Sequence, residues 1–376
     1  MRQTPVAFAV LAGVLLAATP ATAQFSVEAE VGTMVDDNVN NNSLRLTDRI
    51  VSAGLQAGYD WTTDRTNTTL QYNGGYSYFT LVPGRSNQVH GGGLTFAQIF
   101  GDDEETLWNA AAGYSVRTDR EEFIYYDNSA FTASTSLKHQ FSTQFVGRAG
   151  YSLRLMRFPN LASFDHAEHQ LFIQGSTFLP SHTTIIGQID LGMKLYSTPN
   201  EDTTVAASGR GRRTSALSSP GVTQLSGSVR VGQSLFAQTG LSVAGGYQLN
   251  LRKDTRYLGS TTGLIADDEI FDDHYGYEGP QASLMLTQIL PWDIKARLSG
   301  SWQRRTYSTQ PAYDDAGTQL AARRLDTRSA VNLTVTVPVP ALSCTIGLAY
   351  DRIWNTSNDP FYAYTNNAFT VQLSFP

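Results

Sequence analysis

The sequence predicts an all-β fold, namely an up-and-down antiparallel β-barrel of about 16 strands that spans a membrane. Three observations lead to this fold class. Apolar and polar residues alternate over many short runs, the breaks between the runs are alternately short and long, and aromatic residues stand at the ends of the runs. Each run is close to the roughly 9–11 residues that a tilted strand needs to cross a bilayer.

The alternation begins near the N-terminus, where Phe25, Val27, Ala29 and Val31 are separated by polar residues or glycine. A period of two indicates a strand with one apolar and one polar face. The same pattern predicts strands at 24–35, 51–61, 70–78, 89–100, 106–117, 129–141, 144–156, 168–179, 184–196, 221–235, 241–252, 280–290, 294–306, 328–337, 342–354 and 367–375. An even number of strands returns both termini of the chain to the same side of the membrane.

The last predicted strand ends on Phe375, followed by Pro376. A strand edge with a hydrophobic face needs a partner, and the most economical partner is the first strand. We therefore expect 24–35 to pair with 367–375 and close the barrel. A Phe-containing, alternating C-terminus resembles the terminal strand of Gram-negative outer-membrane barrels. The resemblance implies recognition of this strand by the barrel-insertion machinery.

The breaks between strands distinguish a membrane barrel from a soluble sandwich. Short breaks lie at 62–65, 101–105, 142–143, 180–182, 237–240, 291–293 and 338–340. Longer breaks lie at 36–48, 118–128, 157–167, 197–220, 253–279, 307–327 and 355–366, with one of intermediate length at 82–88. Tight periplasmic turns and long outer loops produce this rhythm, whereas a soluble sandwich gives no reason for it.

The N-terminus has the pattern of a secretory signal, with Arg2 before an apolar run and the small residues Ala21, Thr22 and Ala23 at a cleavage position. We therefore predict that residues 1–23 are removed and that 24–376 form one domain. No later stretch approaches the roughly 20 apolar residues of a spanning helix. The single Cys344 cannot form an internal disulfide, and the net charge of −6 argues against a nucleic-acid partner.

If the apolar phase of each strand faces lipid, the other phase lines the interior. Many of its residues are glycine or serine, which suits a hollow barrel. Its acidic members are Glu28, Glu30, Asp60 and Asp190, and its more numerous basic members are Arg117, Lys138, Arg148, Arg154, Lys194, Arg230, Arg252, Lys295 and Arg297. Cations in a pore favour anions. Alternatively, they pair with loop carboxylates and only keep the wall wetted.

Two long loops carry opposite charge. The 197–220 loop contains Arg210, Arg212 and Arg213, whereas the 253–279 loop contains Asp267, Asp268, Glu269, Asp272 and Asp273. Either loop could fold inward as a constriction. We favour the alternative that both are solvated outer loops.

Motifs for metal binding or catalysis are weak. The Asp36–Asn40 cluster lacks the glycine and glutamate of a calcium loop. His166 and His169 flank Glu168 in an expected outer loop, which is a thin metal signal. Serines and histidines are too scattered to suggest a catalytic triad. We expect the protein to bind no cofactor and no metal and to have no enzymatic activity.

The segment Gly32–Val39, followed by Thr47–Ile50 and a strand ending near Asp60 and Trp61, resembles the opening of a β-barrel porin family of Gram-negative bacteria. Members are often associated with surface or exopolysaccharide export. The resemblance implies an outer-membrane location among lipid and lipopolysaccharide, and a transport role.

The expected function is therefore a porin-like channel for passive passage of small or saccharide solutes, with anion preference or a part in polysaccharide export. One alternative is a structural or adhesive barrel whose outer loops bind a partner. The other is an outer-membrane hydrolase.

Overall fold

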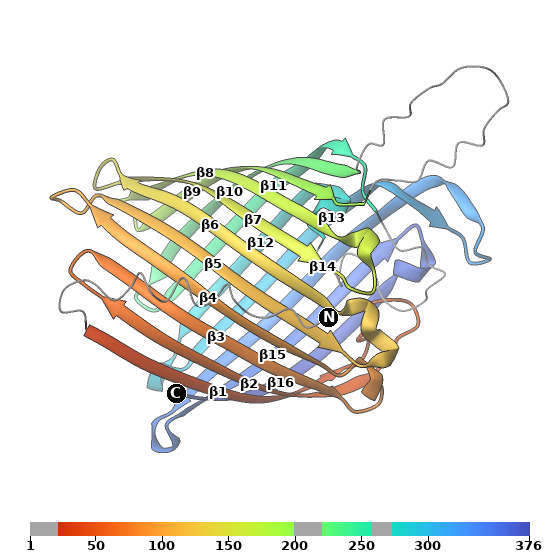
Figure 1. The fold of residues 1–376 in the computed structure, drawn as a ribbon, viewed down its shortest axis with the longest axis horizontal. Coiled ribbons are helices and arrows are strands. Elements are labelled where there is room, and N and C mark those ends of the chain that lie inside the picture. Colours follow the sequence, from red (N-terminus) through yellow and green to blue (C-terminus); the bar gives the residue numbers. More distant parts are fainter. Residues whose placement is uncertain (1–21, 199–219, 257–272) are drawn as a thin grey trace, which may run out of the picture.

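The computed structural model describes residues 22–198, 220–256 and 273–376. These residues form a closed antiparallel barrel in which consecutive strands are neighbours and the first strand pairs with the last (Figure 1). The predicted all-β barrel of 16 strands is confirmed. Helices in the described residues are short 3-10 turns, and none is long and apolar enough to cross a membrane.

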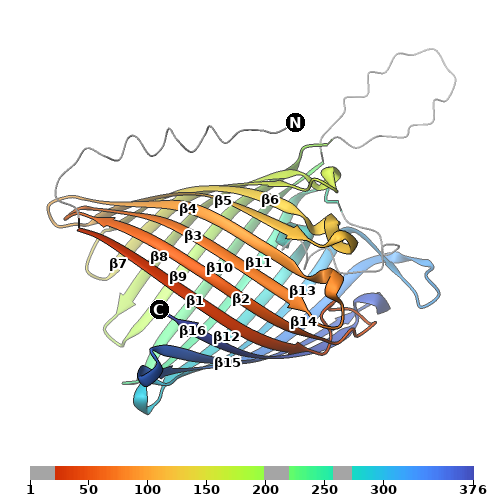
Figure 2. The same cartoon turned by 60° about the horizontal axis from the view of Figure 1, so that its bottom comes forward.

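The strands are β1 (Thr22–Asp36), β2 (Asp48–Thr62), β3 (Thr66–Phe79), β4 (Asn87–Phe100), β5 (Thr106–Asp119), β6 (Asn128–Gln140), β7 (Phe145–Arg157), β8 (His166–Leu179), β9 (Thr183–Tyr196), β10 (Gly221–Phe236), β11 (Thr239–Lys253), β12 (Tyr277–Ile289), β13 (Lys295–Tyr313), β14 (Gln319–Val339), β15 (Cys344–Ser357) and β16 (Tyr364–Phe375). The 3-10 helices are η1 (Pro83–Arg85), η2 (Glu121–Tyr126), η3 (Ala162–Phe164), η5 (His274–Gly276), η6 (Pro291–Asp293), η7 (Pro340–Leu342) and η8 (Pro360–Tyr362). Short turns lie at one end of the barrel and long loops at the other (Figure 2).

Pairing of β1 with β16 closes the barrel as predicted. The register places Ala29 opposite Phe375 and Val31 opposite Leu373. Directly opposed residues of antiparallel strands share a face. The closure therefore joins apolar side chains on the outside of the barrel, and none of the described strands is left with an unpaired edge.

The outer wall is apolar because the alternating residues remain in register from strand to strand. Leu171, Leu191, Leu225 and Leu249 lie opposite one another across β8 to β11. Each of these side chains is between 37% and 51% exposed. An exposed row of leucines is the surface expected of a barrel that faces lipid.

Buried apolar side chains gather under the long loops. Ala130, Met156, Phe158 and Phe164 form a cluster there, and Leu161 packs against it. This cluster joins β6 and β7 to η3. Loop packing thus supplies the compact core at this end, while backbone pairing builds the wall.

The loop expected at 307–327 is wrong, because most of it belongs to β13 and β14. These two strands form an extended hairpin that projects from the long-loop end (Figure 1). Arg324 stabilises it: the guanidinium lies 4.1 Å from the ring centre of Tyr307 and 3.3 Å from that of Tyr362. It also donates to Asp326 at 3.0 Å. Register shifts around Pro311 interrupt the alternation, which is why the pattern did not show a strand.

The predicted signal at 1–23 lies almost wholly outside the described residues and stays a prediction. The backbone of β1 is already paired at Thr22, which lies opposite Thr62. Cleavage after Ala23 would leave the remaining β1 pairs intact.

Adjacent residues at the middle of β10 test which face meets lipid. Val229 points outward and is 54% exposed, whereas its neighbour Ser228 points inward. We expect Val229→Arg to lower the free energy of unfolding in lipid vesicles by about 2–4 kcal/mol, because it places a charge in hydrocarbon. Ser228→Arg, the matched control, should cost far less. Equal losses in denaturant titrations would contradict the assignment of the two faces.

Candidate functional site: the interior of the barrel

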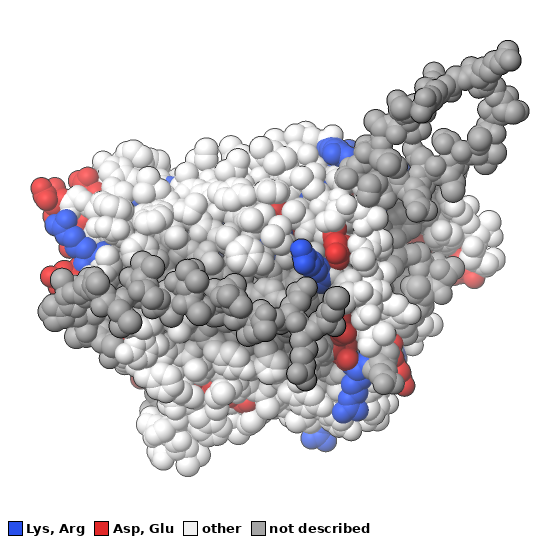
Figure 3. Space-filling model, viewed as in Figure 1, with Lys and Arg blue, Asp and Glu red and all other residues white. Residues whose placement is uncertain are grey.

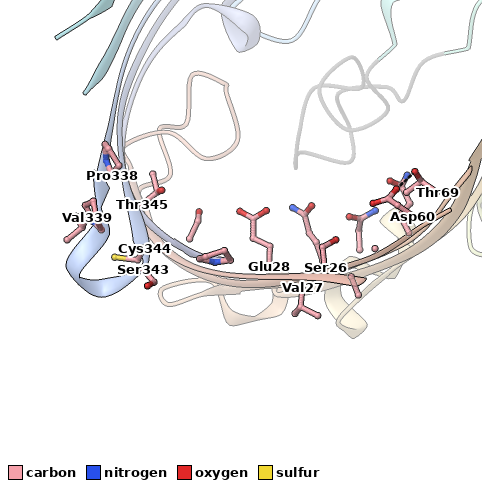
Figure 4. A pocket seen from close by; sticks show the side chains of 18 residues that line it. Ser26, Val27, Glu28, Asp60, Thr69, Pro338, Val339, Ser343, Cys344 and Thr345 are labelled. Carbon is pink, nitrogen blue, oxygen red and sulfur yellow. Dashed lines mark hydrogen bonds between the residues drawn. The ribbon is translucent and has the colours of Figure 1, made fainter. Parts of the chain in front are cut away.

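The inward face can be identified from one strand and followed around the wall. In Figure 4, Ser26 and Glu28 point to the concave side of the sheet, and Val27 points to the convex side. Directly opposed residues share a face, so the register carries this assignment through all strands and back to β1. The interior is therefore lined by the polar phase.

The register places every predicted lumen cation except Arg252 on the inward face, namely Arg117, Lys138, Arg148, Arg154, Lys194, Arg230, Lys295 and Arg297. The assignment of Arg252 is corrected. A register shift places Arg252 opposite Thr223, whose side chain points outward, and Arg252 instead forms an ion pair with Asp254 at 3.1 Å. Such a bulge reverses the alternation, which a strict period of two does not foresee.

Toward the long-loop end, three of the predicted lumen cations are paired with carboxylates. Arg117 contacts Asp119 at 2.8 Å, and Lys194 contacts Asp273 at 2.8 Å. Arg154 lies 3.6 Å from Glu168. In the half of the barrel near the long loops, the predicted lumen cations therefore pair with carboxylates, which is the alternative given by the sequence. Asp119 was missed because the predicted strand ends at residue 117, and Glu168 was considered only as part of a weak metal signal.

The other five predicted lumen cations that point inward are called the inner cations: Lys138, Arg148, Arg230, Lys295 and Arg297. They lie at mid-strand or toward the short turns. No carboxylate of the described residues is within 4.0 Å of any of them. Their charge is therefore available to a solute.

One of the inner cations, Arg148, is held in place by its neighbours. Lys138 and Arg148 lie directly opposite each other in β6 and β7. Arg148 donates to the Ser136 hydroxyl at 3.0 Å, and its guanidinium lies 5.4 Å from the ring centre of Phe172. The contact with the aromatic ring positions the guanidinium and leaves its positive charge unneutralised.

The inner wall formed by β1 and β2 is acidic near the short turns. Glu28 and Asp60 line a hollow of about 560 Å³ together with Thr69 and Gln71 (Figure 4). On β15, Asp351 also points inward and accepts a hydrogen bond from Asn332 at 2.7 Å. Positive charge on β6, β7 and β10 thus lies across the barrel from negative charge on β1, β2 and β15. The predicted acid Asp190 on β9 also points inward and accepts a hydrogen bond from Gln170 at 2.9 Å.

A short segment at Asp273–Tyr277, called the shelf, folds onto the inner wall. Side-chain amides of Gln224 and Gln248 donate to the His274 carbonyl at 3.0 and 3.1 Å. Asn250 donates to the Tyr275 carbonyl at 2.9 Å. These three amides occupy inward positions of β10 and β11, and they are the sequence signal that the expectation of a solvated loop overlooked.

The shelf narrows the outer half of the lumen. The Tyr275 side chain lines a cavity of about 300 Å³ together with Arg154 and Glu168. Burial raises the pKa of the Tyr275 phenol above its usual range, so the group remains neutral. The described end of the 253–279 loop therefore folds into the barrel. The sequence alone favours a solvated outer loop for this segment.

Other loop residues named from the sequence lie outside the described residues. They are Arg210, Arg212, Arg213, Asp267, Asp268, Glu269 and Asp272. His166 and His169 belong to β8 and not to a loop as expected. They lie opposite Tyr196 and Met193 respectively, so they point to opposite faces of the wall.

Several solved structures share this architecture. OccAB1 of Acinetobacter baumannii superposes with a TM-score of 0.53 at 9% identity, covering 94% of this chain and 96% of that one. OpdL of Pseudomonas aeruginosa has a TM-score of 0.52 at 9% identity, with coverages of 94% and 98%. The chain has the fold of outer-membrane porins. OpdK of the same species, solved with vanillate, has a TM-score of 0.51 at 8% identity, with coverages of 94% and 98%.

These identities show the fold alone. No protein-family model matches the chain, and no curated protein matches it. The resemblance of Gly32–Val39 to a porin family linked to exopolysaccharide export therefore stays a prediction.

The buried ion pair that holds the shelf can be tested by a double-mutant cycle. Lys194→Met leaves the Asp273 carboxylate without its cation, and we expect the free energy of unfolding to fall by about 3–5 kcal/mol. The double variant Lys194→Met/Asp273→Asn should recover part of this loss, since no unpaired charge remains. The Tyr275 amide, which donates to Asp273 at 3.1 Å, should exchange hydrogen faster in Lys194→Met.

Arg154 provides the control for this cycle. Its side chain is 36% exposed and lies 3.6 Å from Glu168, so Arg154→Gln should cost about 0–1 kcal/mol. Losses of equal size at Arg154 and Lys194 would show that the buried pair has no special role.

Proposed function

We propose that the protein is a passive channel of the Gram-negative outer membrane that prefers anionic solutes. The observation that carries this proposal is the set of inner cations. They project from a polar wall, and no carboxylate of the described residues neutralises them. Cations that line a water-filled passage raise the local concentration of anions and lower their barrier to transfer.

Solvent exposure along the inward face supports a water-filled passage. Gln71, Asn73, Ser228, Arg230 and Gln281 all point inward and are exposed. A described segment packed across the middle of the barrel would bury them. This exposure argues against an adhesive barrel with a filled lumen, and the solved structures give no reason to propose an enzyme.

The solute class follows from the chemistry of the wall. Arginine and lysine recognise carboxylate and phosphate groups, and the many serine, threonine and amide side chains offer hydrogen bonds to hydroxyl groups. We propose small organic anions or anionic saccharide chains as solutes. A part in polysaccharide export rests on the family resemblance alone.

Ion selectivity in planar bilayers tests the proposal. The reversal potential across a KCl gradient should show preference for chloride in the wild-type protein. Replacing all five inner cations by Gln should move the potential toward cation preference, since the inward acids Glu28, Glu30, Asp60, Asp190 and Asp351 remain in the lumen. Arg304→Gln, which removes positive charge from the outer wall, is the control and should leave the potential unchanged.

Two results would contradict the proposal in different ways. Absence of conductance would show that the protein is not a channel. Cation preference in the wild-type protein would mean that the acidic wall of β1, β2 and β15 sets the selectivity.

A further inference from the structure

Charged residues are unevenly distributed on the outer wall. The visible face of the barrel is mostly free of charge along its middle (Figure 3). On the described strands, every outward-facing Lys, Arg, Asp or Glu lies toward the long-loop end, and most of them are arginines. The outward face near the short turns carries aromatic residues such as Trp61 and Trp108 instead.

Four of these arginines, called the outer belt, are Arg49 on β2, Arg157 on β7, Arg304 on β13 and Arg352 on β15. Each is exposed, and the register places each on the apolar face, opposite residues such as Val35 and Val331. No carboxylate of the described residues lies within 4.0 Å of any of them. The outward acid Glu278 is already paired with Lys253 at 2.8 Å.

Aromatic side chains show at which depth the outer belt lies. The guanidinium of Arg352 is 4.9 Å from the ring centre of Trp354, and Arg304 follows the outward, 41% exposed Trp302 by two residues. In the same zone, Arg120 lies over Tyr78 at 6.0 Å. Tryptophan and tyrosine collect at the headgroup level of a bilayer. The arginines next to them therefore reach lipid headgroups and not hydrocarbon.

We propose that the outer belt binds the phosphate groups of anionic lipid in the leaflet at the long-loop end. Arginine suits this ligand, because its planar fork of N–H donors matches phosphate oxygens and its charge is permanent. Tryptophan beside it supplies an apolar contact for the upper acyl chain. The confinement of free cations to one end makes the protein complementary to a membrane whose two leaflets differ in charge.

This inference does not depend on conduction through the lumen. It requires only the outward face and its position in a bilayer. The residues involved are separate from the inner cations, so a failure of either proposal leaves the other intact.

Native mass spectrometry of the full chain in detergent, titrated with bisphosphorylated lipid A, tests the outer belt. The variant Arg49→Gln/Arg157→Gln/Arg304→Gln/Arg352→Gln should bind the lipid more weakly, by about fivefold for each arginine that contributes. A matched variant, Lys138→Gln/Arg148→Gln/Arg230→Gln/Arg297→Gln, removes the same charge from the lumen and should bind as the wild type does. Heat-modifiable migration on gels checks that both variants are folded.

Further arms identify what is recognised. Dephosphorylated lipid A should bind more weakly than the bisphosphorylated form, and inorganic phosphate at the same concentration should not compete. Should the fourfold variant not fold, Arg304→Gln and Arg352→Gln singly should each show the partial loss, and Arg352→Lys should retain part of the affinity. Equal binding by the belt variants, equal binding of the dephosphorylated lipid, or full competition by inorganic phosphate would each overturn the proposal.

Discussion

Hydrogen bonding between β1 and β16 is the constraint on which the rest of the structure depends. In a bilayer no water is present to satisfy backbone amides and carbonyls, so a spanning sheet must close on itself. The register Val31 opposite Leu373 brings the apolar face of the last strand onto the apolar face of the first. A slip of one residue would turn one of these faces inward. Closure thus defines inside and outside for the whole barrel.

The cations inside the barrel have different surroundings at its two ends. Near the long loops, Arg117, Arg154 and Lys194 each have a carboxylate within 3.6 Å. Toward the short turns, the inner cations on β6, β7 and β10 face an acidic wall across the lumen and not a contacting partner. A solute entering from the loops would first meet nearly neutral walls, and then a field directed across the barrel. The separation of charge can therefore orient a solute as well as attract it.

The shelf and the extended β13–β14 hairpin show how the loop end is held together. Amide side chains of β10 and β11 bind the carbonyls of the shelf, so backbone groups that leave the sheet remain satisfied. The Arg324 guanidinium, between the rings of Tyr307 and Tyr362, joins the hairpin to η8. Both devices use hydrogen bonds and stacking to organise segments that have few apolar residues to bury.

The sequence by itself determined the barrel, because a period of two and the rhythm of breaks are local properties. It also assigned Arg148, Arg230 and Arg297 to the inward face, since a regular strand turns every second residue the same way. Only the tertiary structure decided which cations keep their charge free. That property depends on Asp119, Glu168 and Asp273 coming within contact distance, and a contact between neighbouring strands or a folded loop is not a local pattern. The bulge at Arg252 and the strand around Pro311 were likewise decided by pairing with a neighbour, because register shifts leave no periodic trace in the chain.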